Sequence, residues 1–157
     1  MAYILRPAAP ADLQAVLAWI DSPEALRLWG GHRLTWPPEV EKTWYEIGAD
    51  GHNTFALVDV DGSLAGYGQT LPHEPARVHL GRIILAPEAR GQGVGRVLVG
   101  ALIGAARENF HAAAITLNVY RENLPAVRLY RSLGFVVALE DEAQGSYAMR
   151  LDGAETS

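Results

Sequence analysis

The sequence predicts an α/β (α+β) fold in which one central, mixed and mostly antiparallel sheet of about seven strands is flanked by helices. Three observations lead to this prediction. The chain has 157 residues, 49% of them hydrophobic and 20% charged, as in one globular domain with a sizeable core. Strand-like and helix-like segments follow in the order strand, helices, three strands, helix, strand, helix and two strands. No repeat or linker divides them, so we expect one domain over residues 1–152 and a tail at 153–157.

The first third of the chain predicts one short strand and three helices. Tyr3–Arg6 has a strand pattern, and Pro10 begins a helix with apolar residues on one stripe. Ser22 is a good N-cap and is followed by a proline, so we expect a second helix that ends near Gly30. A third helix is expected over Glu39–Ile47, directly after two prolines.

The next segment predicts a hairpin and a further strand. Thr54–Val60 and Ser63–Leu71 are strand-like, and the Asp-Gly pair between them favours a type I′ turn. Two prolines in Pro72–Pro75 should interrupt the pairing. Another strand is expected over Arg77–Leu85.

The second half predicts two helices and three strands. Val94–Asn109 has the firmest helical pattern, followed by a strand at Ile115–Val119 and a helix at Leu124–Leu133. Phe135–Leu139 and Tyr147–Leu151 should form a last antiparallel pair. The expected buried face of the long helix consists of Val94, Val97, Leu98, Ala101, Leu102 and Ala105.

Composition excludes several kinds of chemistry. The chain has no cysteine, which removes disulfides, thiolate metal sites and a cysteine nucleophile. Its five histidines show no ligand spacing, so we expect no metal. The start lacks the charged and apolar regions of a signal peptide, and the longest uncharged apolar stretch, Val97–Ala106, is too short for a membrane span. We therefore expect a soluble, cytoplasmic protein without a membrane partner.

Charge is distributed unevenly along the chain. Residues 1–75 hold four basic and ten acidic side chains, a net charge of −6, whereas residues 76–131 hold eight arginines against three acids, a net charge of +5. Clustered arginines favour a phosphorylated or carboxylated ligand, although solvated helix faces would give the same count. The overall net charge of −5 argues against a nucleic-acid partner.

A glycine-rich loop, Arg90–Arg96, lies between the fourth expected strand and the long helix. Glycine at alternate positions lets the backbone approach a ligand, and the helix start offers unpaired amides for a phosphate. Arg96 stands where a dinucleotide-binding loop has its third glycine, and no Gly-Lys-Ser/Thr ending makes it a Walker loop. Taken alone, the glycines could equally serve a turn and helix packing.

Two blocks of the sequence resemble the GCN5-related N-acetyltransferase (GNAT) family. The family signature of Arg or Gln, two residues, Gly, one residue, and Gly or Ala is met by Arg90, Gly93 and Gly95 after the strand Arg82–Leu85. The second block is similar to the family's strand, Asn, helix, Tyr and Gly-Phe segment. Its matching residues are Leu117–Asn123, Ala126, Leu129, Tyr130 and Leu133–Phe135. The expected strand order also agrees with the GNAT fold.

The resemblance implies that acetyl-CoA lies between the strands that end at Leu85 and Val119. The backbone of Ile83, Ile84 and Leu85 would pair with the pantetheine arm in the manner of an added strand. The other cofactor-binding residues implied are Arg90, Gly91, Gln92, Gly93, Val94, Gly95 and Arg96 for the pyrophosphate, and Asn118, Asn123 and Tyr130 for the rest of the molecule. Tyr130 is also the implied proton donor to the departing thiolate, unless it is simply a core aromatic.

Because the chain has no cysteine, the expected mechanism is direct attack of an acceptor amine on the thioester. The amine must lose a proton, which calls for a base. His79 aligns with a glutamate of many family members and is the candidate, since an imidazole takes up protons near neutral pH. A packed or surface histidine is the simpler interpretation, and Glu74 and Asn118 are the other candidates for this role.

The acceptor side is expected to lie before the glycine-loop strand. Trp19 and Trp44 fit core stripes, whereas Trp29 and Trp36 flank a glycine loop where aromatic faces would suit a cationic amine. The expected partner is a small-molecule or peptide amine, and the resemblance allows a homodimer. The alternative function is a coenzyme A-binding sensor or interaction module with little or no catalysis, because the family glutamate is absent at His79.

Overall fold

The computed structural model describes residues 2–153. The expected tail at 153–157 lies outside the described residues except for Gly153, and the single domain over 1–152 stays a prediction. The chain forms two compact units. The first holds the residues up to Gln69 together with Arg82–Leu98, and the second holds Thr70–Gly81 together with the residues from Val99 onward.

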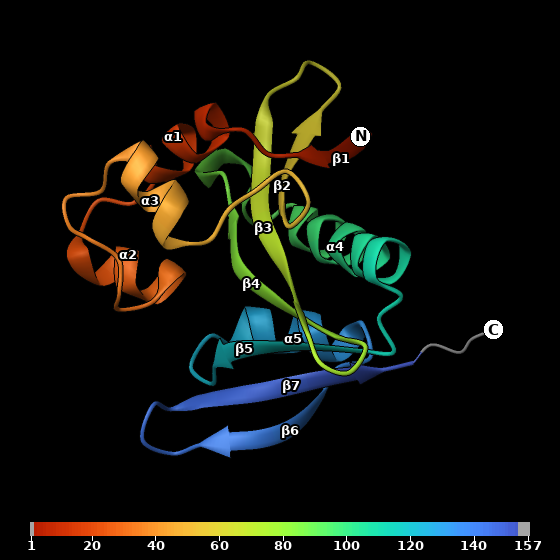
Figure 1. Ribbon diagram of the computed structural model, residues 1–157. Helices are drawn as coiled ribbons and strands as arrows, with labels where there is room; N and C mark the ends of the chain where they lie inside the picture. Colours follow the sequence, from red (N-terminus) through yellow and green to blue (C-terminus); the bar gives the residue numbers. More distant parts are fainter. Residues whose placement is uncertain (1, 154–157) are drawn as a thin grey trace. The chain divides into compact units, whose positions relative to one another are not determined.

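A seven-stranded mixed sheet organises the chain (Figure 1). Its strands are β1 (Tyr3–Pro7), β2 (Thr54–Asp59), β3 (Leu64–His73), β4 (Arg77–Leu85), β5 (Ala114–Tyr120), β6 (Val136–Asp141) and β7 (Ser146–Asp152), in the order β1-β2-β3-β4-β5-β7-β6. The helices are α1 (Pro10–Ala18), α2 (Pro23–Gly30), α3 (Val40–Glu46), α4 (Val94–Phe110) and α5 (Leu124–Ser132). The β4–β5 pair is parallel, whereas β1–β2, β2–β3, β5–β7 and β6–β7 are antiparallel. The predicted fold class is therefore confirmed.

In the first unit, α1, α2 and α3 share one hydrophobic core with the sheet. The core contains Leu13, Val16, Leu17, Ile20, Leu26, Ile47, Ala56 and Tyr67. As expected for core residues, Trp19 and Trp44 pack against it. The N-cap prediction for α2 is also confirmed, because the Ser22 hydroxyl accepts a hydrogen bond from the Ala25 amide at 3.0 Å. Local signals and apolar periodicity were thus sufficient to locate these helices.

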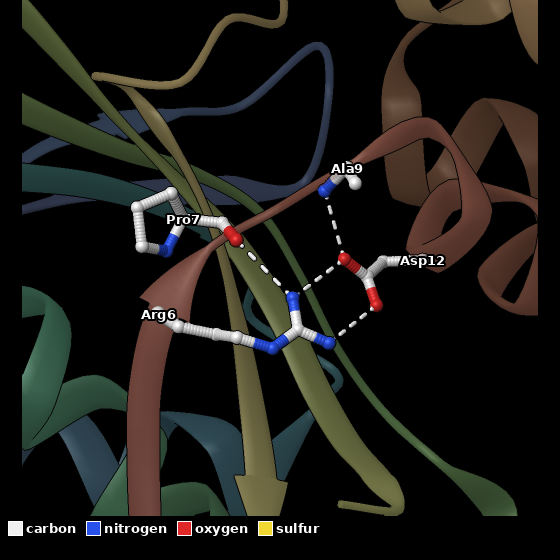
Figure 2. A network of polar contacts seen from close by, with 4 residues as sticks. All are labelled: Arg6, Pro7, Ala9 and Asp12. Carbon is white, nitrogen blue, oxygen red and sulfur yellow. Dashed lines mark hydrogen bonds and ion pairs between the residues drawn. The ribbon is translucent and has the colours of Figure 1, made fainter.

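An ion pair joins the end of β1 to the start of α1 (Figure 2). The Arg6 guanidinium donates to both Asp12 carboxylate oxygens at 2.8 and 2.9 Å, and the Ala9 amide donates to one of them at 2.8 Å. Burial alone would raise the pKa of Asp12, but these hydrogen bonds and the Arg6 charge together hold the pKa below its ordinary value. The carboxylate also lies in the first turn of α1, where the helix dipole favours it.

We expect Asp12→Asn to lower the free energy of unfolding at neutral pH by about 1 kcal/mol, a small value because Arg6 is solvent-exposed. Asparagine keeps an oxygen for Ala9, but it removes the charge and the second acceptor oxygen for Arg6. Since the folded-state pKa is depressed, the unfolded chain binds the proton more tightly. The contribution is therefore present above about pH 4 and is lost as the pH falls through the folded-state pKa. Thermal unfolding of both proteins across this range should give curves that converge in acid, and equal stabilities at neutral pH would contradict the prediction.

The β2–β3 connection differs from the predicted type I′ turn. Only Gly62 of the Asp-Gly pair has a positive φ, 83°, whereas a type I′ turn needs two such residues. The Asp59 carboxylate instead accepts hydrogen bonds from the Asp61 and Ser63 amides at 2.9 and 3.0 Å, while its carbonyl accepts from Gly62. These hydrogen bonds stabilise a turn over residues 59–63, so the connection is longer than the two-residue turn that was predicted. The predicted interruption at Pro72–Pro75 also begins late, because β3 continues to His73.

Helix α4 confirms half of its predicted buried face, because Val94, Leu98 and Leu102 are buried as expected. Val97 is exposed, and Ala101 and Ala105 are half-buried. The buried residues are Val94, Leu98, Val99, Leu102, Ile103 and Ala106. The predicted face was centred about one residue too early along the helix, because alanine and valine occur around much of its circumference and the period alone does not choose among them.

The second unit contains β5, β7 and β6, with α5 packed near β5. Ala114–Tyr120 pairs along β7, while Arg77–Leu80 of β4 pairs in parallel with Ala114–Leu117. Strand β6 stands at the end of the strand order and is largely exposed. Its pairing with β7 shifts register between Val137 and Leu139. The parallel pairing of Arg77–Leu80 with Ala114–Leu117 thus makes the first half of β4 the neighbour of β5.

Candidate functional site

In the first unit, the end of β4 and the glycine loop are joined by Arg90. Ile83, Ile84 and Leu85 are half-buried at the end of the strand. The Arg90 guanidinium donates to the Leu85 carbonyl oxygen through Nε at 3.3 Å and Nη2 at 3.1 Å. The first residue of the signature therefore fixes the loop to the strand that precedes it.

The loop itself exposes backbone to its surroundings. Gly91 and Gly93 have φ values of 74° and 81°, in the region that favours glycine. A Cβ atom at either position would meet no atom within 4 Å. The Gln92 side chain anchors the loop by donating to the Glu88 carbonyl at 2.7 Å. Together these features leave room for a ligand to approach the loop backbone.

Helix α4 begins at Val94, which is buried and fixes the helix start beneath the loop. The first amides of a helix have no partner within it, and its dipole is positive at this end. Gly95 and Arg96 continue the first turn, with the Arg96 side chain exposed. Loop amides, helix start and arginine charge fit the pyrophosphate of acetyl-CoA.

In the second unit, Tyr130 lies on α5 and is 8% exposed. Its ring packs edge-to-face on Phe135 with 6.0 Å between centroids. Burial raises the pKa of Tyr130. The phenol is therefore protonated at neutral pH, and its ring contributes to packing.

The two asparagines of the second block lie on neighbouring elements. Asn118 is exposed on β5, opposite Ala148 of β7. Asn123 is the N-cap of α5, and its Oδ1 accepts a hydrogen bond from the Ala126 amide at 3.3 Å. Its oxygen therefore serves the helix, so any hydrogen bond that it gives to a cofactor would come from the side-chain amide nitrogen.

His79 lies on β4 within a polar cluster of the second unit. Its Nδ1 is 2.9 Å from the Thr116 hydroxyl, which also accepts from Arg77 Nη1 at 3.3 Å. The His73 ring meets the His79 ring edge-on at 6.3 Å. The Thr116 hydroxyl can accept a hydrogen bond from Nδ1 or donate one to it, so the contact fixes the ring without setting its tautomer. The cluster therefore permits, without requiring, a base at His79.

The structure brings the candidate residues together in two groups. The first unit holds residues 83–85 and 90–96, and the second holds His79, Asn118, Asn123 and Tyr130. Sequence reasoning missed Thr116 as the partner of His79. Arg77 and His79 lie two residues apart, so they share a face of β4, a signal that the sequence does contain. The residue of β5 that lies opposite them depends on the strand register, which the sequence does not determine.

Two tryptophans were expected near the acceptor. Trp29 lies on α2, packs against the core and donates from Nε1 to the Arg82 carbonyl at 2.9 Å. Packing is therefore the established role of Trp29. Trp36, in contrast, is exposed over 41% of its surface.

The described residues contain neither a membrane-spanning helix nor a metal-binding cluster. Within residues 2–153, no helix combines the length and apolar character that crossing a membrane requires. Over the same part of the chain, no cluster of three or more His, Cys, Asp or Glu side chains has the arrangement of a metal site.

Comparison with solved structures supports the fold. A spermidine N-acetyltransferase from Vibrio cholerae, in complex with CoA and spermine, superposes with a TM-score of 0.77 at 22% identity, over 96% of this chain and 95% of that one. The yncA protein of Salmonella typhimurium with its cofactor acetyl-CoA gives a TM-score of 0.74 at 22% identity, over 100% and 97% of the two chains. At these identities the likeness establishes the fold alone.

Sequence comparison identifies the family. Streptothricin acetyltransferase of Streptomyces lavendulae is 37% identical over 103 residues, which are 62% of this chain and 54% of that protein. The matched part thus spans about half of this relative's length. The family model described as "Acetyltransferase (GNAT) family" matches residues 17–135, which include the glycine loop, the β4–β5 pair and α5. The chain therefore belongs to the acetyltransferase (GNAT) family, as its two sequence blocks predicted.

Proposed function

We propose that the protein transfers an acetyl group from acetyl-CoA directly to a primary amine. The observation that carries this proposal is the loop at residues 90–96, whose two left-handed glycines open the backbone at the start of α4. Family membership supports the donor, because the matched region contains that loop. The absence of cysteine supports a single transfer without a thioester on the enzyme.

This proposal assigns the cofactor-binding roles residue by residue. Backbone groups of Ile83–Leu85 hold the pantetheine arm, and the amides of residues 91–96 hold the pyrophosphate. Asn118 and Asn123 are the other residues proposed to contact the cofactor. Acetyl-CoA supplies the activated acyl group, and the enzyme contributes orientation and proton transfer.

Acetyl transfer exchanges one bond to the acetyl carbon for another. A neutral acceptor amine forms a bond to the acetyl carbon, and the carbon–sulfur bond breaks. Tyr130 gives its proton to the sulfur, and His79 takes the proton that the amine loses, directly or through water. The buried phenol supports the first role, because burial raises the pKa of Tyr130 and keeps it protonated. The Thr116 contact supports the second by fixing the His79 ring.

We expect His79→Gln to lower kcat by about 10-fold to 100-fold and to change its dependence on pH, because glutamine cannot take up the proton. Steady-state rates measured from acid to alkaline pH would check this. His73→Gln is the matched control, since it removes the neighbouring ring without touching Thr116. An unchanged rate and pH profile in His79→Gln would transfer the role to Glu74, Asn118 or water.

The acceptor is proposed to be a small-molecule or peptide amine. Two of the similar proteins are named as a streptothricin acetyltransferase and a spermidine N-acetyltransferase, and the acidic segment 1–75 would attract cationic amines. The partly exposed Trp36 offers an aromatic ring for a cation.

The proposal also includes a cytoplasmic location, which agrees with the lack of cysteine. It includes self-association as well, since a related Vibrio cholerae enzyme is dodecameric.

The second candidate is a coenzyme A sensor with little or no catalysis, favoured by His79 in place of the family glutamate and by the contact that occupies its Nδ1. One experiment separates the two. Calorimetric titration with acetyl-CoA tests binding, and free-thiol release tests transfer across a panel of polyamines, amino acids, aminoglycosides and peptide N-termini. Binding with transfer supports the enzyme, and binding without transfer supports the sensor. No binding would reject both functions.

A further inference from the structure

Arg82 has a backbone conformation that is unusual for a strand residue. Its φ is 50°, in the left-handed region that non-glycine residues seldom adopt. It lies within β4 and directly precedes Ile83–Leu85, the residues proposed to pair with pantetheine. A conformation of this kind persists only where the surroundings fix it. The contacts of Arg82 should therefore explain it.

Three hydrogen bonds hold Arg82, all within the first unit. Its Nε donates to the Gly30 carbonyl at 3.1 Å, and its Nη1 donates to Gln69 Oε1 at 2.8 Å. Its own carbonyl accepts from Trp29 Nε1 at 2.9 Å. The residue is thus bound to α2 through both its backbone and its side chain, and to β3 through its side chain.

The acceptor on β3 is itself fixed. Gln69 is fully buried, and its Nε2 donates to the Ile47 carbonyl at 3.1 Å and to the Thr54 hydroxyl at 3.0 Å. These two donations orient the side-chain amide so that Oε1 faces Arg82. A guanidinium presents its donors in a rigid fork, which suits two acceptors on different elements. Lysine has no such fork.

The geometry has a direct consequence for the strand end. A left-handed residue changes the direction in which the following amide and carbonyl groups point, and the Arg82 carbonyl bonds a tryptophan side chain. We propose that Arg82 is a positioning residue whose contacts with Trp29, Gly30 and Gln69 aim the backbone of Ile83–Leu85 at the pantetheine arm. This inference rests on the proposed function.

The test compares two ligands that differ only in the pantetheine arm, coenzyme A and adenosine 3′-phosphate 5′-diphosphate. We expect Arg82→Gly, which suits the backbone but loses the side chain, to weaken coenzyme A binding about 10-fold and to change binding of the fragment less than about 2-fold. Arg82→Lys should fall between wild type and glycine. Trp29→Phe keeps the ring, removes the donor to the Arg82 carbonyl, and should shift coenzyme A binding in the same direction.

Ala76→Gly is the matched control, because Ala76 also has a left-handed φ, 57°, and lies in the turn before β4. It should leave both affinities unchanged. Equal losses for coenzyme A and the fragment in Arg82→Gly and Trp29→Phe would reduce Arg82 to a stabilising role and overturn the inference. Unchanged coenzyme A binding in both variants would also overturn it. If the unaltered protein binds coenzyme A but transfers no acetyl group, the inference survives the loss of the enzyme proposal. If it binds no coenzyme A, both fall.

Discussion

Tyr130→Phe is expected to lower kcat about 100-fold while the Kd for coenzyme A stays within about 2-fold of wild type. Phenylalanine keeps the ring on Phe135 and removes only the hydroxyl. If the phenol protonates the departing thiolate, its loss acts on the transition state and leaves ground-state binding unchanged. The comparison of single-turnover rates with calorimetric affinities measures the two effects separately.

The simpler role for Tyr130 is packing, and it predicts another outcome. Loss of a hydroxyl from a core ring would change the free energy of unfolding by no more than about 1 kcal/mol and leave kcat intact. Tyr147→Phe on β7 is the matched control, since it removes a hydroxyl from a half-buried tyrosine of the same unit. Wild-type turnover in Tyr130→Phe would remove this residue from the mechanism.

Gly93→Val is expected to raise the Kd for coenzyme A about 100-fold or more, the largest effect on binding. A branched side chain is strained at a φ of 81°, and it would fill the open space over the loop where the pyrophosphate is proposed to lie. Both effects oppose the approach of a phosphate to the loop amides. Calorimetric titration of the variant with coenzyme A measures the loss.

A second glycine separates strain from ligand contact. Gly62 has nearly the same conformation, with a φ of 83°, and a Cβ there would also meet no atom within 4 Å. Gly62→Val should therefore lower the free energy of unfolding by about 1–2 kcal/mol, as much as Gly93→Val does. Unlike Gly93→Val, it should leave the affinity for coenzyme A unchanged. If both variants bound coenzyme A like wild type, the loop would not be the phosphate site.

Most of the fold could be predicted because its signals are local. The Ser22 cap, the apolar run of β2 and the glycine loop before α4 each depend on neighbouring residues. The predictions failed where one sequence pattern was compatible with several turn types or with several buried faces of a helix. Asp59 selected a longer loop than the Asp-Gly pair implied, and the buried face of α4 lay about one residue further along.

The geometry around the candidate site was less predictable because it depends on distant partners. The side chain of Arg82, a residue with a left-handed φ, is held by hydrogen bonds to Gly30, 52 positions earlier, and to Gln69, 13 positions earlier. The His79 contact depends on a residue 37 positions later, through the parallel register of β4 and β5. Sequence reasoning identified chemically suitable residues, but tertiary contacts determine which of their atoms are available.

The free edges of the sheet bear on how the protein behaves at high concentration. Strands β1 and β6 end the strand order, and an exposed edge is a template for pairing with another chain. Ile4 on β1 and Leu139 on β6 are exposed, which would favour such pairing. Yet β1 is only five residues long and ends at Pro7, while β6 shifts register and ends in two acidic residues. Both edges thus carry features that discourage edge-to-edge aggregation, so any self-association of this enzyme should use another surface.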